Sequence, residues 1–181
     1  MVRGVGNGLI PRRLASLLPL LLAACSGLGT QVSRLPNDLH LRGYRLLPRP
    51  LSLPQSHQSD DCVPEALVGV MAYWERPCSV PELALLGRQM GLKGMVFTSI
   101  PPLARRRGFQ VEFLDGTIPK IRSAIDRGVP PLIGTHVGVG NFHAFVVIGY
   151  SDREQKVICE DYADAKRFIG YEELEQSWKE S

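Results

Sequence analysis

The chain has 181 residues, 44% of them hydrophobic and 22% charged, which suits one globular domain preceded by a leader. Of its 21 basic residues, Arg3, Arg12 and Arg13 precede residue 25, and the other 18 equal the 18 acidic residues. The domain itself therefore lacks the basic surplus with which proteins displace counterions from nucleic acid, and we expect no nucleic-acid partner. Composition does not separate an enzyme from a binding module.

Residues 1–24 have the order of features typical of a secretory signal. Two arginines in "IPRRLASLLPLLLAAC" precede a short apolar run, Leu14–Leu22, which is too short to span a bilayer comfortably. The end of this run resembles the bacterial lipobox, which implies cleavage before Cys25 and lipidation of its sulfur. We expect an exported protein attached to the cell envelope through Cys25, facing the periplasm from the outer membrane if the cell is Gram-negative. An ordinary signal peptide with a chance cysteine, or a buried apolar helix, is the alternative.

Residues 25–50 contain several prolines and show no sustained hydrophobic period, so we expect a tether there. The globular domain is expected over residues 51–181. Its first helix is predicted from Val63 to Trp74, because apolar residues recur at spacings of three and four. A second helix is predicted in "SVPELALLGRQMG", which begins with the spacing of a capping box, and a third in "TSIPPLARRRG".

The second half of the domain is predicted to be richer in strands. "FQVEFL" alternates apolar and polar residues like a half-buried strand, and "GTIPKIRSAIDRG" is typical of a helix with proline in its first turn. Gly108 is expected to end the third helix and Gly128 this one. "PPLIGTH", "HAFVVIGY" and "QKVICED" then predict neighbouring antiparallel strands, and "YEELEQSW" a closing helix. Helices followed by strands indicate an α+β fold.

Three residues far apart in the chain form a candidate catalytic set. Cys62 lies at the predicted start of the first helix, where unpaired backbone N–H groups and the positive end of the dipole favour a thiolate. His143 begins the most apolar strand and could act as the base. Asp161 ends the next strand, so that one hairpin would bring it beside His143 to orient the ring. Asp164 competes for this role but lies further into the loop.

An oxyanion hole needs hydrogen-bond donors at the attacked carbonyl. The backbone N–H of Cys62 and the side chain of an upstream glutamine could supply them, and Gln55 and Gln58 are both available.

The segments "LPQSHQSDDCVPEALVGVMAYW", "FHAFVVIGY" and "VICEDY" resemble motifs of papain-like cysteine peptidases of the bacteriocin-processing type. The resemblance covers almost the whole expected domain. It implies a papain-like α+β fold, with an N-terminal helical part packed on a small antiparallel sheet. It also implies hydrolysis of a peptide or protein substrate through a thioester, with Cys62 as nucleophile, His143 as general base and acid, Asp161 as orienting residue and Gln55, in preference to Gln58, in the oxyanion hole.

The sequence departs from this family pattern at Val63, where the family usually has a glycine that lets the substrate approach closely. A valine there narrows the cleft or signals lost activity. The alternative function is therefore a catalytically inactive, papain-like module that binds peptides at the cell envelope.

Cys78 and Cys159 allow two interpretations, a disulfide that leaves Cys62 free, or two small buried thiols, which we favour. No cofactor or metal is expected, because the sequence contains no C-x-x-C, H-x-x-x-H or H-E-x-x-H motif.

Overall fold

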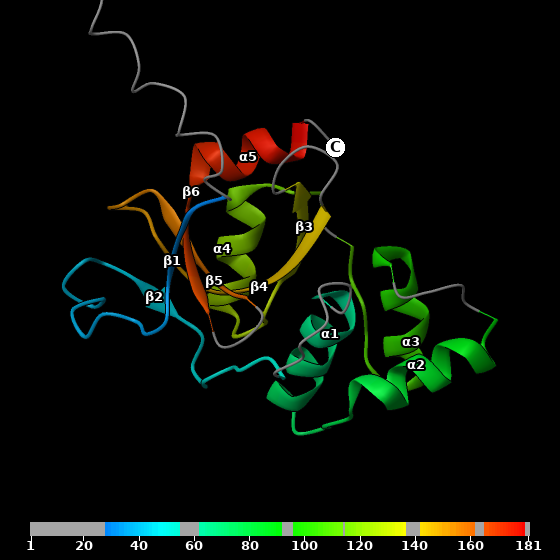
Figure 1. The fold of residues 1–181 in the computed structure, drawn as a ribbon. Coiled ribbons are helices and arrows are strands. Elements are labelled where there is room, and N and C mark those ends of the chain that lie inside the picture. The colour runs from blue at the N-terminus through cyan, green and yellow to red at the C-terminus, as the bar shows by residue number, and fades with distance from the viewer. Residues whose placement is uncertain are drawn as a thin grey trace, which may run out of the picture.

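The computed structural model describes residues 28–54, 62–91, 96–113, 115–136, 142–161 and 165–179. The elements are β1 Thr30–Val32, β2 Arg45–Leu46, α1 Cys62–Tyr73, α2 Val80–Gln89, the 3-10 helix η2 Phe97–Ser99, α3 Ile100–Arg106, α4 Ile118–Asp126, β3 Leu132–His136, β4 Phe142–Ser151, β5 Lys156–Glu160, β6 Lys166–Gly170 and α5 Tyr171–Lys179. In Figure 1, α1, α2 and α3 lie together on one side of the molecule and the sheet on the other, with α5 along one end of the sheet. This arrangement confirms the predicted α+β fold.

The sheet is antiparallel and is organised around β4. Its strands run in the order β1-β6-β5-β4-β2, and β3 also pairs with β4. Strand β3 pairs with the first half of β4, where Thr135 lies opposite His143, and β2 pairs with the second half, where Arg45 lies opposite Tyr150. Every residue of β4 from Ala144 to Ser151 is buried, as its nearly continuous apolar sequence predicts for a strand covered on both faces.

The start of α1 is held against the sheet by the core. Val63 and Ala66 of this helix are buried in the same hydrophobic cluster as Phe145 to Val147 of β4. A second cluster joins α1 to α2 and α3 through Leu67, Leu83 and Leu103. Packing on two sides gives α1 a fixed position, and with it the residue at its N-terminus.

The predicted helix ends are confirmed where local chemistry specifies them. Ser79 and Glu82 form both bonds of a capping box at the start of α2. Gly108 and Gly128 follow α3 and α4 with φ angles of +79° and +72°, a conformation that glycine adopts at little cost. None of the helices in the described part of the chain is long and apolar enough to cross a membrane.

The prediction of a strand in "FQVEFL" is wrong. Residues 109–113 form no strand and connect α3 towards α4. Phe109 and Val111 pack against the cluster between the helices, whereas the side chain of Phe113 is 73% exposed. Alternation of apolar and polar residues suits any extended segment with one buried side, and a strand also requires a pairing partner.

The segment before the helices is part of the folded domain, which differs from the tether expected over residues 25–50. Strand β1 pairs with β6 and β2 with β4, and Leu39, Tyr44 and Leu47 are buried. Neither β1 nor β2 was predicted, and β6 was also missed.

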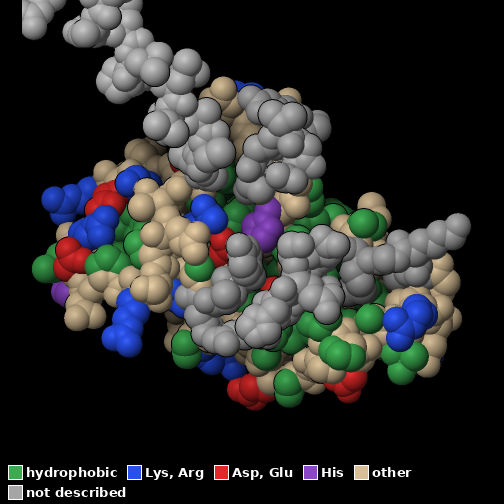
Figure 2. All heavy atoms as spheres, viewed as in Figure 1, with side chains coloured by type: hydrophobic (Ala, Val, Ile, Leu, Met, Phe, Trp, Pro, Cys, Tyr) green, Lys and Arg blue, Asp and Glu red, His purple; other side chains and the backbone are tan. Residues whose placement is uncertain are grey.

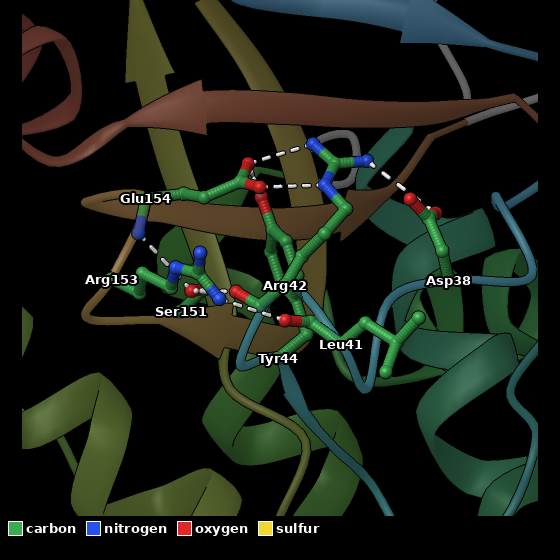
Figure 3. Close-up of polar contacts among 7 residues, drawn as sticks. All are labelled: Asp38, Leu41, Arg42, Tyr44, Ser151, Arg153 and Glu154. Atoms are coloured by element: carbon green, nitrogen blue, oxygen red, sulfur yellow. Dashed lines mark hydrogen bonds and ion pairs between the residues drawn. The ribbon is translucent and has the colours of Figure 1, made fainter.

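A polar cluster attaches this segment to the turn between β4 and β5 (Figure 3). Arg42 donates to both carboxylate oxygens of Glu154, at 2.5 and 2.7 Å, and the Tyr44 hydroxyl donates to the same group at 2.9 Å. Ser151 donates to the backbone oxygen of Arg42 at 2.9 Å, and Arg153 donates to that of Leu41 at the same distance. Acidic and basic side chains lie intermingled at the left of Figure 2, over the sheet.

Candidate active site

Cys62 is the first residue of α1 and is partly exposed. The groups that act on its thiol are the His143 side chain and the backbone of Ala144 and Val63, which favour the thiolate by hydrogen bonding. Burial alone would raise the pKa of the Cys62 thiol, but these bonds and the charge of the imidazole outweigh it and hold the pKa below its ordinary value. The helix start therefore presents a sulfur that ionises readily.

His143 and Asp161 meet because β4 and β5 form a hairpin. Val146 pairs with Glu160, which places Asp161, just after β5, beside the beginning of β4. The Nε2 atom of His143 lies 2.6 Å from the Oδ1 atom of Asp161. Because Nε2 faces the carboxylate, Nδ1 is the ring nitrogen left to face Cys62.

The surroundings of His143 favour the protonated form of its ring. Its burial would lower its pKa, but hydrogen bonds to Asp161 and Cys62, and their charges, raise the pKa to about 9. The ring also packs edge-on against Phe145, with centroids 4.5 Å apart. A raised histidine pKa beside a lowered thiol pKa favours transfer of the Cys62 proton to His143, which gives a thiolate and imidazolium pair.

Sequence analysis did not single out Arg167, which contacts the other carboxylate oxygen of Asp161. Its Nε atom donates to Oδ2 of Asp161 at 2.7 Å, and the Asp161 side chain is fully buried. No local motif marks this arginine. Only the prediction of β6, and of its pairing with β5, could have placed it beside Asp161.

The structure brings together Cys62, His143 and Asp161 from the predicted set. Gln55, Gln58, Cys25 and Asp164 lie outside the described residues, so the glutamine of the oxyanion hole, the lipidation site and the competing aspartate stay predictions. Val63 is 5% exposed and packs in the main hydrophobic core. Its side chain is thereby directed into the protein interior.

The three described cysteines are all free thiols. Cys159 is fully buried, and burial raises its pKa. Cys78 is partly buried beside Met71, and burial raises its pKa as well. These two thiols fit the favoured interpretation of small packing residues, and Cys62 is the described cysteine whose pKa is lowered. Within the ranges described, no three His, Cys, Asp or Glu side chains gather as a metal site would require.

A large open cavity lies between the helices and the sheet. Its volume is about 1310 Å³, and its lining includes Trp74 just after α1, Phe97 of η2, Leu132 of β3 and Trp178 of α5. The ring of Phe97 packs edge-on against Phe142, the residue before His143, with centroids 5.2 Å apart. Phe97 thus links the wall of the cavity to the strand that carries the histidine, although no described residue of β4 is itself part of the lining.

Comparison with known proteins identifies the kind of domain. The sequence model described as the Peptidase C39 family matches residues 51–181. Among solved structures, the chain is similar to the peptidase domain of Streptococcus ComA, a bifunctional ABC transporter involved in a quorum sensing pathway. The TM-score is 0.59 at 19% sequence identity, over 71% of this chain and 93% of the other. This likeness bears on the fold and confirms the papain-like prediction. No curated protein sequence matches the chain.

Proposed function

The chain belongs to the Peptidase C39 family, and from this premise we propose that it hydrolyses peptide bonds with Cys62 as nucleophile, His143 as general acid and base, and Asp161 as the orienting carboxylate. One observation carries the proposal. Nε2 of His143 lies 2.6 Å from Oδ1 of Asp161, and the same imidazole is one of the groups that lower the pKa of the Cys62 thiol. These are the contacts that an activated cysteine nucleophile requires.

The reaction follows from the charges on these groups. The Cys62 thiolate attacks the carbonyl carbon of the peptide bond, and the electron pair of the C=O bond moves to oxygen. As this oxyanion collapses, the C–N bond breaks and the His143 imidazolium gives its proton to the departing amine. A thioester remains on Cys62. Neutral His143 then takes a proton from water, which attacks the thioester and releases the carboxylic acid and the thiol.

Asp161 serves both steps without itself exchanging a proton. Its hydrogen bond to Nε2 keeps the other nitrogen of His143 directed at Cys62 and stabilises the charged ring. The developing oxyanion requires donors, and we assign them to the backbone N–H of Cys62 and the side chain of Gln55, with Gln58 as the alternative. The peptide or protein substrate would lie in the cavity between the helices and the sheet.

The inactive peptide-binding module is the less favoured alternative. A cysteine retained only for packing has no reason to ionise readily, and the burial of Val63 in the core removes one motive for expecting a blocked cleft. The deciding experiment compares wild type with Cys62→Ala on a peptide library, alongside labelling by a thiol-directed peptidase inhibitor. We expect cleavage and labelling by wild type and neither by the folded variant. A folded wild-type protein that neither cleaves nor is labelled would overturn the proposal.

We also propose that the protein is exported and carries a lipid on the sulfur of Cys25. The backbone oxygen of Leu28 accepts a hydrogen bond from Arg167, so the folded domain begins close to Cys25 in sequence. Leu28 is three residues after Cys25, and a chain of this length spans at most about 10 Å. A lipid on Cys25 would therefore hold the β1 edge of the sheet near the membrane surface.

A further inference from the structure

We propose that Arg167 is a positioning residue of the catalytic site, which aims the Asp161 carboxylate at His143, and that strand β1 in turn holds Arg167 in place. This inference rests on the proposed function of Cys62, His143 and Asp161. It adds to that site a residue from β6 and a supporting strand that lies outside the family match over residues 51–181.

The first step of the argument concerns the carboxylate of Asp161. Its side chain is 0% exposed, so water does not solvate its charge. Oδ1 faces Nε2 of His143 at 2.6 Å, and Oδ2 accepts from Nε of Arg167 at 2.7 Å. A buried carboxylate stays ionised only if cations and donors replace its water. Because its two oxygens are rigidly joined, the arginine that holds Oδ2 also sets the direction in which Oδ1 points.

The second step concerns what holds the arginine. Its Nη1 atom donates to the backbone oxygen of Leu28 at 3.0 Å, and Nη2 donates to Oε1 of Gln31 at 3.1 Å. Gln31 lies directly opposite Arg167 in the pairing of β1 with β6. All three guanidinium nitrogens therefore have partners: Gln31 of β1, Leu28 just before β1, and Asp161. A planar donor group held at three points cannot turn away from the carboxylate without breaking the other bonds.

Arg167 also packs into the layer beneath the catalytic ring. Its guanidinium carbon lies 5.9 Å from the centre of the Phe145 ring, and the same ring contacts His143. The position of the arginine is thus linked to the imidazole through both a carboxylate and an aromatic side chain. This geometry suits a residue that acts through Asp161 and does not touch substrate.

A neighbouring ion pair provides a matched comparison. Lys166 donates to Glu160 at 2.9 Å, and the Glu160 side chain is also fully buried. This pair also joins β5 to β6. Glu160 precedes Asp161 and Lys166 precedes Arg167 by one residue, and successive side chains of a strand point to opposite faces, so the pair lies on the other face of the sheet. Removal of Lys166 should disturb the strands about as much as removal of Arg167 and leave His143 aligned.

The charged and titratable groups around Asp161 determine the expected pH dependence. His143 of β4 and Arg167 of β6 bond to it directly, and Cys159 of β5 interacts with its charge. Without Arg167, the buried Oδ2 of Asp161 loses the donor that holds it, and the carboxylate can turn so that Oδ1 no longer faces Nε2 of His143. The carboxylate then stabilises the imidazolium less, and the pKa of His143 should fall from about 9.

The test uses the full chain with Arg167→Gln, Arg167→Lys, Gln31→Ala and Lys166→Gln, compared with wild type and Cys62→Ala. We measure kcat and KM on a peptide that wild type cleaves, the pH profile of kcat/KM, and the pH dependence of Cys62 alkylation by iodoacetamide. Arg167→Gln should lower kcat by about 10- to 100-fold, with KM within about twofold, as expected for a supporting residue. The alkaline limb of the kcat/KM profile of Arg167→Gln should move to lower pH. Arg167→Lys should recover part of the lost kcat, because lysine keeps the positive charge. Gln31→Ala should lower kcat less than Arg167→Gln does. Lys166→Gln should keep at least about one third of the wild-type kcat.

The inference is overturned if Arg167→Gln keeps kcat within about twofold of wild type, if only KM changes, or if Lys166→Gln loses as much activity. A fully active Cys62→Ala variant would instead overturn the proposed function. If no cleavable peptide is found, alkylation decides. A shifted pH profile for Cys62 in Arg167→Gln, with an unshifted one in Lys166→Gln, supports the inference, and identical profiles in both overturn it.

Discussion

The Nε2 atom of His143 lies 2.6 Å from the Oδ1 atom of Asp161, although the two residues are 18 positions apart in the chain. The hairpin of β4 and β5 makes this contact, and the residues stand at the end of the sheet that meets the N-terminus of α1. Whatever fixes the register of that hairpin also fixes the orientation of the imidazole towards Cys62.

Replacing Asp161 with asparagine should remove the charge that stabilises the imidazolium. We expect kcat to fall on the order of 10²- to 10⁴-fold, because an amide holds the ring less firmly and does not stabilise its positive charge. The matched control is Asp126→Asn, since Asp126 also accepts a hydrogen bond from a β4 side chain, Tyr150, at 2.8 Å, but lies away from Cys62. Steady-state kinetics on both folded variants checks the prediction. Equal losses would argue against a specific role for Asp161.

Activity should depend on pH through the pair formed by Cys62 and His143. As pH rises through about 9, His143 loses the proton that it must give to the leaving amine, and kcat/KM should fall. As pH falls through the lowered pKa of Cys62, the thiolate takes up a proton and activity should fall again. Kinetics in a series of buffers of constant ionic strength measures both limbs. A rate that keeps rising beyond pH 9 would contradict the assigned role of the imidazolium.

Alkylation should distinguish the three described thiols. At neutral pH, iodoacetamide should modify Cys62 first, because its pKa is lowered, whereas burial raises the pKa of Cys78 and Cys159. Peptide mapping after brief treatment identifies the modified residue. His143→Ala should slow the modification of Cys62 while the protein remains folded. Preferential modification of Cys78 in wild type would count against an activated Cys62.

The segment before the helices should contribute to stability as part of the domain. Leu39→Ala should lower the free energy of unfolding by about 2 to 5 kcal/mol, since Leu39 is 6% exposed in the main core. Leu41→Ala should change it by less than about 0.5 kcal/mol, because Leu41 is 67% exposed in the same segment. Denaturant unfolding of both variants makes the comparison. Similar small effects would show that the segment is only loosely attached.

Membrane attachment depends on one side chain, according to the proposal for Cys25. Cys25→Ser should abolish incorporation of a labelled fatty acid and move the protein from the membrane fraction to the soluble one. Cys62→Ser is the control, since it removes a thiol from the folded domain and should leave lipidation unchanged. Retained labelling in Cys25→Ser would disprove the assigned site.

Much of the architecture could be read from the sequence because its signals are local. The spacing of apolar residues placed α1, the capping box of Ser79 and Glu82 placed the start of α2, and Gly108 and Gly128 marked helix ends. Each of these depends on side chains within one or two helical turns. The order of motifs also predicted that Cys62, His143 and Asp161 would meet, since a single hairpin and one helix start suffice to join them.

Beyond the pairing of β3, β4 and β5, the tertiary structure alone decided which segments pair. The alternation in "FQVEFL" resembles a strand but finds no partner, whereas the short β1, β2 and β6 lack a strong pattern and become strands because the sheet offers an edge to each. The contact of Arg167 with Asp161 depends on that pairing. This contact joins β6 to the residue just after β5 and is supported from β1. No local feature of the sequence specifies the register across strands that brings such charges together.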